Sequence, residues 1–300
     1  MKHISSIKKT TLLLPLIFII LISGCTIPFL NIEMPWFGNG AVEYEDDIII
    51  IKNIRPSPSA SIVSGQTLTV YADIQNIEAA GGETKKVSVS MYDYCTNLFE
   101  KKSCEAGAEK KDCENIELLP RQTKQIKWEL IAKDVNLKVP CDLKVKVTYE
   151  HETETITQIT FIDPAVLDVR IQNQEPWQIQ GSSAIGYGPV KPYLKVETQQ
   201  PVSAGTDAPV SLQIKNLGHG YVENSAIKEI GPIEGEGLSI NCNPSDDYKQ
   251  LINKQSSKYF CTVKKDNVDI EQTFDLRTKI KYNYEFRKTT KVYVEPRPRV

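Results

Sequence analysis

The sequence predicts an all-β protein in which two tandem antiparallel β-sandwiches follow an N-terminal signal segment and a tether. Three observations support this fold class. Apolar and polar residues alternate with a period of two over much of the chain from Ile48 onward, which is typical of strands with one buried and one solvated face. Spacing typical of helices is almost absent. Three blocks of the first half also recur in the same order in the second half.

The first 24 residues have the features of a secretion signal. A positively charged segment contains Lys2, Lys8 and Lys9. It is followed by an apolar run at residues 12–22 and then by two small residues, Ser23-Gly24, before a possible cleavage site. The apolar run is shorter than the roughly 20 residues that a helix needs to span a bilayer. We therefore expect residues 1–24 to be a signal peptide.

The four residues that end this segment, Ile22-Ser23-Gly24-Cys25, resemble the lipobox of bacterial and archaeal lipoproteins. In those proteins the cysteine thiol is lipidated and becomes the first residue of the mature chain. The resemblance implies that Cys25 is lipidated, and that membrane lipid anchors the exported protein to the outer face of the cell membrane. The alternatives are an ordinary signal peptide with an incidental cysteine, or an uncleaved anchor.

Of the other six cysteines, four lie in the first half and two in the second, an even number in each. Even numbers are expected of disulfides in an exported protein, and the second half holds a single possible pair. A zinc site is not expected, because no spacing is C-x₂-C and no histidine is near. The disulfide candidates are Cys95, Cys104, Cys113, Cys141, Cys242 and Cys261.

Composition sets further limits. The 300 residues are 40% hydrophobic and 25% charged, which is ordinary for a globular protein with room for two domains. The formal net charge is -2, and removal of a signal with three lysines would leave a mildly acidic chain. Nucleic-acid-binding domains need clustered Lys and Arg, so we expect no nucleic-acid partner.

Residues 25–46 contain the lipidation site and then a tether with two prolines, two glycines and no clean periodicity. Such a segment spans roughly 25 Å as a random coil. An alternative is that its apolar residues lie against the membrane interface or a partner. These residues are Phe29, Leu30, Met34, Trp36 and Phe37.

The first sandwich is predicted over residues 47–163. Its period-two strands lie at residues 66–76, 85–95, 123–130 and 141–149. The sequence EHETE, residues 150–154, is predicted to form a turn. Residues 155–163 then return as the last strand of a hairpin.

The second sandwich is predicted over residues 190–296, after a connection at residues 164–189 that is part strand and part linker punctuated by Gly and Pro. Residues 297–300 form a tail. The repeat supports this division, because residues 63–76 match 202–216, 118–134 match 251–266, and 145–161 match 279–294. Each copy is long enough to bury its own core, so two independently folding domains are predicted.

The repeated pattern is an opening strand, then Val-Ser-Gly-x-Thr (63–67) into a strand that ends in Ile-Gln-Asn or Ile-Lys-Asn, and later a final hairpin with tyrosines. It resembles the CARDB-like immunoglobulin-fold modules of archaeal and bacterial surface proteins. The resemblance covers residues 47–163 and 190–296, and rests on pattern rather than on a diagnostic motif. Each half carries a cysteine-bearing insertion that the simplest members lack. The resemblance implies immunoglobulin-like sandwiches used for adhesion, spacing or partner binding, and implies no chemistry.

In an immunoglobulin-like topology the strand ending at Cys95 and the strand beginning at Cys141 are antiparallel neighbours, with both sulfurs on the core side. Cys104 and Cys113 would then close the intervening loop. The pairing Cys95–Cys104 with Cys113–Cys141 staples the same loop, and sequence alone does not choose among the three possible pairings.

Candidate catalytic groups are few. The mature chain keeps His151, in the predicted turn, and His219, in the loop LGHGY, and has no H-E-x-x-H, no G-x-S-x-G and no phosphate-binding loop. The acidic clusters Glu45-Asp46-Asp47 and Asp246-Asp247 lack the ligand spacing of a calcium loop and are predicted to be solvated acids at strand ends. We expect no enzyme activity, no metal and no cofactor.

Two functions fit these observations. The first is a cell-surface lipoprotein that acts as a non-catalytic, adhesin-like binding or scaffolding protein, with loops 96–117 and 231–250 contacting a protein or glycan partner. The second is an accessory spacer subunit of a membrane-bound enzyme, transporter, or pilus or secretion complex. A hydrolase would need a nucleophile and base, or paired carboxylates, for which the sequence offers no candidate set.

Overall fold

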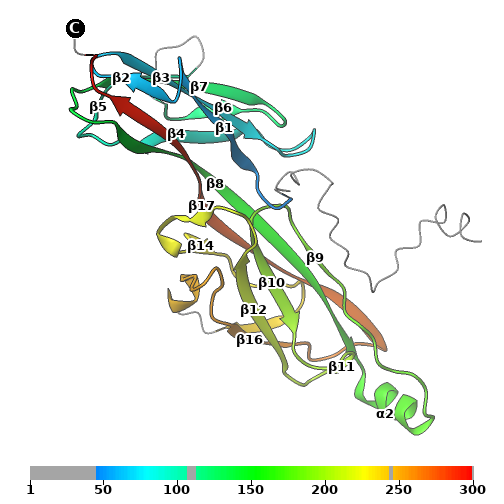
Figure 1. The fold of residues 1–300 in the computed structure, drawn as a ribbon. Coiled ribbons are helices and arrows are strands. Elements are labelled where there is room, and N and C mark those ends of the chain that lie inside the picture. The colour runs from blue at the N-terminus through cyan, green and yellow to red at the C-terminus, as the bar shows by residue number, and fades with distance from the viewer. Residues whose placement is uncertain (1–44, 107–112, 243–245, 299–300) are drawn as a thin grey trace, which may run out of the picture. The chain divides into compact units, whose positions relative to one another are not determined.

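The computed structural model describes residues 45–106, 113–242 and 246–298. These residues form three β-sheets, so the predicted all-β sandwich class is confirmed (Figure 1). Strand pairs are antiparallel, except that β8 with β11 and β2 with β17 are short parallel pairs. Cys25 and the predicted signal and tether up to residue 44 lie outside the described residues.

Two of the sheets have four strands each. The first has the order β1-β3-β7-β5, with β1 at Ile49–Ser57, β3 at Thr67–Asn76, β7 at Thr123–Ala132 and β5 at Phe99–Ala106. The second has the order β10-β12-β16-β15, with β10 at Val190–Val196, β12 at Ala208–Asn216, β16 at Tyr259–Lys264 and β15 at Ser239–Cys242.

The third sheet has the order β13-β17-β8-β4-β6, and four short strands extend it by pairing with β8 or β17. Its main strands are β13 at Tyr221–Val222, β17 at Glu271–Glu295, β8 at Val139–Ile162, β4 at Lys85–Asp93 and β6 at Ile116–Leu118. The short ones are β2 at Ser61–Val63, β9 at Ser183–Ile185, β11 at Val202–Ser203 and β14 at Glu229–Ile230.

Two hydrophobic cores lie between the sheets. In the first, Trp128 and Leu68 of the β1-β3-β7-β5 sheet pack with Val145 of β8 and Val292 of β17. In the second, Leu212 of β12 and Val263 of β16 pack with the other ends of β8 and β17, at Ile159 and Phe274. Each four-stranded sheet therefore covers one half of the third sheet, and the third sheet is common to both sandwiches.

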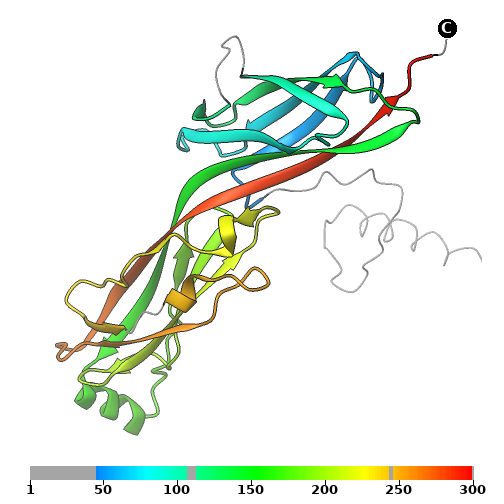
Figure 2. The same ribbon diagram turned by 90° about the vertical axis from the view of Figure 1, so that its left-hand side faces the viewer.

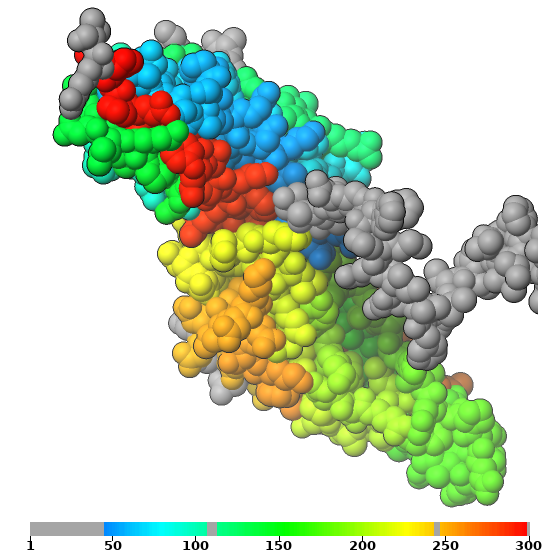
Figure 3. Space-filling view, viewed as in Figure 1, coloured from blue at the N-terminus to red at the C-terminus, as the bar shows by residue number. Residues whose placement is uncertain are grey.

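The two long strands are the main departure from the prediction. β8 has 24 residues and β17 has 25, and they pair without interruption from Ile162 with Glu271 to Val139 with Val294. At ~3.4 Å per residue, this ribbon is about 80 Å long. Figure 2 shows β8 and β17 side by side through both sandwiches. In Figure 3 the C-terminal part of β17 (red) lies between the N-terminal strands (blue) and β8 (green).

The predicted turn at residues 150–154 is therefore wrong. These residues continue β8, with Glu150, Glu152 and Glu154 exposed and His151 and Thr153 buried. The segment contains no Gly, Pro, Asn or Asp to favour a turn. Its inward side chains are polar because they meet polar groups: the Thr153 hydroxyl, for example, lies 3.0 Å from the Tyr282 hydroxyl.

The sequence-based domain boundaries do not coincide with the two sandwiches. The end of β8, near Phe161, belongs to the second core, and the end of β17, near Val292, belongs to the first. Residues 47–163 therefore lack a strand of their own sandwich, and residues 190–296 lack another. The described chain from residue 45 onward falls within one compact unit.

The predicted connection at residues 164–189 contains a helix that the sequence analysis missed. Helix α2 spans Pro164–Gln172, buries no residue, and begins at Asp163, whose carboxylate accepts hydrogen bonds from the backbone N–H groups of Ala165 and Val166. An Asp N-cap followed by Pro is a favoured helix start. Within the described ranges, no helix is long and apolar enough to cross a membrane.

Candidate functional site

His151 and His219 both lie where β8 and β17 pass from one core to the other. His151 is in the middle of β8, paired with Tyr282 of β17, and His219 follows β12. This polar region is named the junction. It consists of Asp47, Lys85, His151, Tyr187, His219, Tyr282 and Tyr284, which are joined through the hydrogen bonds described below and through ring contacts of Tyr282 with His151 and Tyr284.

His151 is held neutral by its two partners. Its Nδ1 atom lies 3.1 Å from the Lys85 ammonium, which can only donate, and its Nε2 atom lies 3.0 Å from the Tyr187 carbonyl oxygen, which can only accept. Only the neutral tautomer with hydrogen on Nε2 satisfies both contacts. Lys85 is itself buried and also donates to the Glu83 carboxylate at 2.7 Å. This arrangement leaves His151 without a lone pair for catalysis.

Replacing His151 with glutamine should reduce the loss of stability on acidification. Burial lowers the pKa of His151; the hydrogen bond to Tyr187 opposes this shift, and the Lys85 ammonium adds to it. The unfolded chain therefore binds a proton near pH 6.5 while the folded chain does not, so stability is retained above that pH and falls below it. Urea unfolding at pH 7.5 and 5.5 should show a smaller decrease for His151→Gln. Equal decreases would contradict a neutral buried histidine.

Asp47 is fully buried, so the prediction of solvated acids at residues 45–47 is wrong for this residue. Its carboxylate accepts hydrogen bonds from the backbone N–H of His219 at 3.2 Å and from the Tyr284 hydroxyl at 3.3 Å, and lies 2.9 Å from Nδ1 of His219. The Tyr187 hydroxyl donates to its carbonyl oxygen at 2.7 Å. Asp46 instead forms an ion pair with Lys191.

The sequence LGHGY brings His219 to this carboxylate because glycines flank it. A Cβ atom at Gly218 would collide with the Tyr284 hydroxyl and with Asp47, and one at Gly220 would lie 2.7 Å from the Tyr284 ring. Only glycine allows such a close approach. The two glycines are therefore explained by packing at the junction.

The junction tyrosines are structural. Tyr282 bonds to the Thr153 hydroxyl at 3.0 Å, and Tyr284 donates to Asn216 at 3.1 Å. Burial raises the pKa of both hydroxyls far above their ordinary value, so they stay neutral. In the described part of the chain, no cluster of three or more His, Cys, Asp or Glu side chains could hold a metal ion.

Three disulfides are present, and they use all six candidate cysteines. Cys95 bonds to Cys141, and Cys104 bonds to Cys113, which is the first of the pairings left open by the sequence. Cys104 lies on β5 in one sheet, and Cys113 precedes β6 in the facing sheet, so this bond staples two sheets. The third bond joins Cys242 of β15 to Cys261 of β16, which are directly paired across the strands.

The first predicted contact loop contains two strands, whereas the second contains one short strand and is mostly irregular. Residues 96–117 contain β5, which pairs with β7, and the start of β6, which pairs with β4. Residues 231–250 contain β15 and the short 3₁₀ helix Asp246–Lys249. The cysteine spacing concealed these strands, because bracing by disulfides is equally consistent with a long loop.

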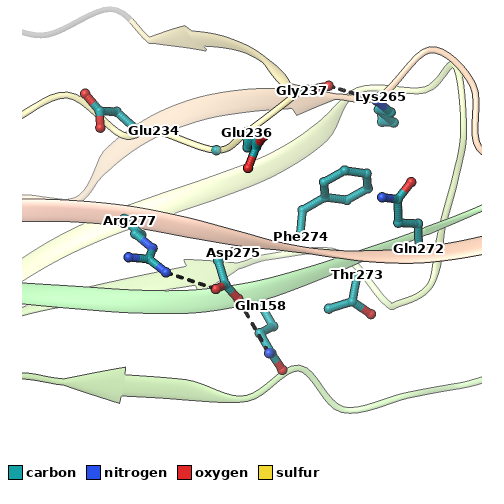
Figure 4. Close-up of a pocket in the computed structure, with 11 residues that line it drawn as sticks. Gln158, Glu234, Glu236, Gly237, Lys265, Gln272, Thr273, Phe274, Asp275 and Arg277 are labelled. Carbon is teal, nitrogen blue, oxygen red and sulfur yellow. Dashed lines mark hydrogen bonds and ion pairs between the residues drawn. The ribbon is translucent and has the colours of Figure 1, made fainter.

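A hollow of about 730 Å³ lies on the second sandwich, beside residues 234–237. Figure 4 shows its walls: this segment on one side, β17 on the other, and Gln158 of β8 below. Arg277 and Gln158 hold the Asp275 carboxylate at 3.3 and 3.5 Å. Lys265 donates to the Gly237 carbonyl oxygen at 3.1 Å and lies 5.2 Å from the centre of the Phe274 ring.

Of this site, only the wall at residues 234–237 lies in a predicted contact loop, 231–250; the other lining residues come from three further segments and share no motif with it. The only local signal is the Gly-rich segment around Gly235. A Cβ atom there would lie 2.7 Å from a methyl carbon of Leu238 and 3.3 Å from the Asp275 carbonyl oxygen. Glycine therefore lets the segment run close to β17 and sets the width of the hollow.

Comparisons with known proteins give little further information. No protein-family model and no curated protein sequence matches the chain. The solved structure of a collagen adhesin (CNA) from S. aureus aligns over 86% of this chain and 96% of that chain, with 10% sequence identity and a TM-score of 0.14. A TM-score this low carries no conclusion about the function of this chain.

Proposed function

We propose that the protein is an exported prokaryotic lipoprotein, anchored to the outer face of the cell membrane by lipid at Cys25, that acts as a non-catalytic, adhesin-like binding or scaffolding protein. Its partners are membrane lipid and a protein or glycan. The β8–β17 ribbon carries the proposal. Because two strands run unbroken through both cores, they hold the surfaces of the two sandwiches in a fixed relative position, as a scaffold requires.

The position of the first strand supports a scaffold held at its middle. The predicted tether joins the described chain next to Asp47, which contacts the junction and not an end of the ribbon. An anchor attached there leaves both ends of the ribbon for contacts with partners. The immunoglobulin-like pattern of the sequence, which resembles CARDB-like modules, agrees with a role in adhesion or partner binding.

The engagement of His151 supports a non-catalytic role. His151 uses both ring nitrogens in contacts with Lys85 and Tyr187, and His219 lies against the buried Asp47 carboxylate. A general base needs a nitrogen that can reach a substrate. Structural use of both ring nitrogens removes His151 as a candidate for that role.

A spacer subunit of a membrane complex is the second candidate, because the ribbon would suit that function too. The two proposals differ in stoichiometry. Native membranes solubilised in mild detergent should release a spacer in fixed ratio with an enzyme, transporter or pilus component. A binding protein should be released alone or with variable partners.

Changing Cys25 to Ser tests the anchor. The Cys25→Ser protein should lose lipid and appear in the soluble fraction or remain as an uncleaved precursor, whereas Cys25-containing protein should remain with the membranes. Fractionation with mass measurement of the N-terminus would show both outcomes. A cleaved Cys25→Ser protein that still sediments with membranes would overturn the lipoprotein proposal.

A further inference from the structure

The hollow on the second sandwich is built from polar side chains of both charges. Its lining carries three carboxylates and two cations, together with amide and hydroxyl groups, and Phe274 is its only large apolar residue. The acidic groups are Glu234, Glu236 and Asp275, the cations are Lys265 and Arg277, and the neutral polar groups are Gln158, Gln272 and Thr273.

Several of these groups are fixed before any ligand arrives. Asp275 is held by Arg277 and Gln158, and Lys265 is held by the Gly237 carbonyl oxygen and the Phe274 ring. Side chains that are already ordered lose less entropy when a ligand binds. In contrast, no described residue forms an ion pair with the exposed Glu234 or Glu236, so these carboxylates can accept hydrogen bonds from a ligand.

The lining selects against several ligand classes. An apolar small molecule would find one aromatic edge and would desolvate many polar groups. A basic peptide would meet Lys265 and Arg277, and an acidic ligand would meet three carboxylates. A neutral polyhydroxylated ligand suits the site best, because each hydroxyl can donate to a carboxylate and accept from a guanidinium, ammonium or amide group.

The hollow continues along β17, which favours a chain of sugar units over a single one. A second hollow of about 320 Å³ shares Glu234 and Arg277 with the first and adds Glu152, Glu154 and Lys279. From Thr273 to Lys279 the outward side chains of β17 line this trough for roughly 20 Å at ~3.3 Å per residue. An extended ligand could contact both hollows at once.

We infer that this trough binds a neutral oligosaccharide through hydrogen bonds from its hydroxyl groups to Glu236, Glu234 and Gln272 and from Arg277 to its oxygens. The inference rests on the proposed role as a binding protein and names its partner class. It places the binding surface on the second sandwich, between β17 and residues 234–237 of the predicted contact loop 231–250, and not on the predicted loop 96–117.

The test uses the full-length chain in detergent micelles and immobilised hexasaccharides of glucose, mannose, galactose and N-acetylglucosamine, with hexalysine and a sulfated hexasaccharide as charged probes. At least one neutral hexasaccharide should bind, and more tightly than its monosaccharide. The double variant Glu236→Gln with Gln272→Ala should weaken binding at least tenfold. Both side chains are exposed, so the fold should be unaffected.

Glu117→Gln is the matched control, since it removes one exposed carboxylate from β6 of the first sandwich and should leave binding unchanged. Binding of hexalysine or the sulfated probe alone, no binding of any neutral hexasaccharide, or equal binding by the double variant would each overturn the inference. Membrane fractionation of the same cells before detergent is added separates this failure from that of the proposed function, because the anchor does not depend on the trough.

Discussion

Residues 47–163 and residues 190–296 should each fail to fold when expressed alone. The first fragment keeps all of β8 but loses the part of β17 that lies between β2 and β8 in its own sandwich. It also exposes the end of β8, including Phe161, which is fully buried in the intact chain. The second fragment loses the β8 partner of β17 along its whole length. Unpaired strands with exposed apolar faces favour aggregation.

A redesigned fragment provides the control. Glu150 of β8 and Asn283 of β17 are directly paired, so a two-residue Asn-Gly turn can join residues 45–150 to residues 283–298 and close the ribbon as a hairpin. This chain keeps both disulfides of the first sandwich and all of its strands. Circular dichroism and thermal melting should show cooperative unfolding for the redesigned fragment and for the intact protein.

The same melts give the contradicting outcome. A cooperative melt for residues 47–163 and for residues 190–296 separately would mean that the ribbon contributes little and that the two sandwiches are independent. If both simple fragments aggregate and the redesigned fragment is soluble and folded, the boundary between the two sandwiches crosses the ribbon at the pair of Glu150 and Asn283.

The strands and fold class were predictable from sequence because period-two burial is a local property. The segment 67–76 alternates buried residues with more exposed ones as expected, and so does 126–132. The division of the chain was not predictable in the same way. Whether Glu150 to Glu154 turn or continue depends on what their inward side chains meet, and those partners, such as Tyr282, lie more than 100 residues away.

For the candidate sites too, the features that depend on local sequence were predictable and those that depend on contacts between distant segments were not. Counting cysteines identified all six that form disulfides, and an immunoglobulin-like topology favoured the pair Cys95–Cys141 that the structure contains. The junction was missed, and only residues 234–237 of the trough lie in a predicted contact loop, because each site gathers side chains from distant segments. Local sequence around Asp47 shows only an acidic cluster, and burial of that carboxylate depends on the loop at His219.

Asp47→Ala should be among the most destabilising substitutions of a polar residue in the described chain, with a loss of about 3 kcal/mol. The carboxylate is fully buried, and its removal leaves the backbone N–H of His219 without its acceptor and takes away one acceptor of the Tyr284 hydroxyl. A cavity at the junction would add to the loss. Urea unfolding at pH 7.5 would measure it.

Asp46→Ala is the matched control, because the neighbouring acid is only partly buried and forms an ion pair with Lys191. Such a pair is worth about 1 kcal/mol or less, so this variant should unfold at nearly the same urea concentration as the unaltered protein. Hydrogen exchange should localise the effect, because amides of β8 around His151 should exchange faster in Asp47→Ala than in Asp46→Ala. Equal destabilisation by the two variants, or unchanged exchange around His151, would mean that the buried carboxylate does not hold the loop at His219 against the ribbon.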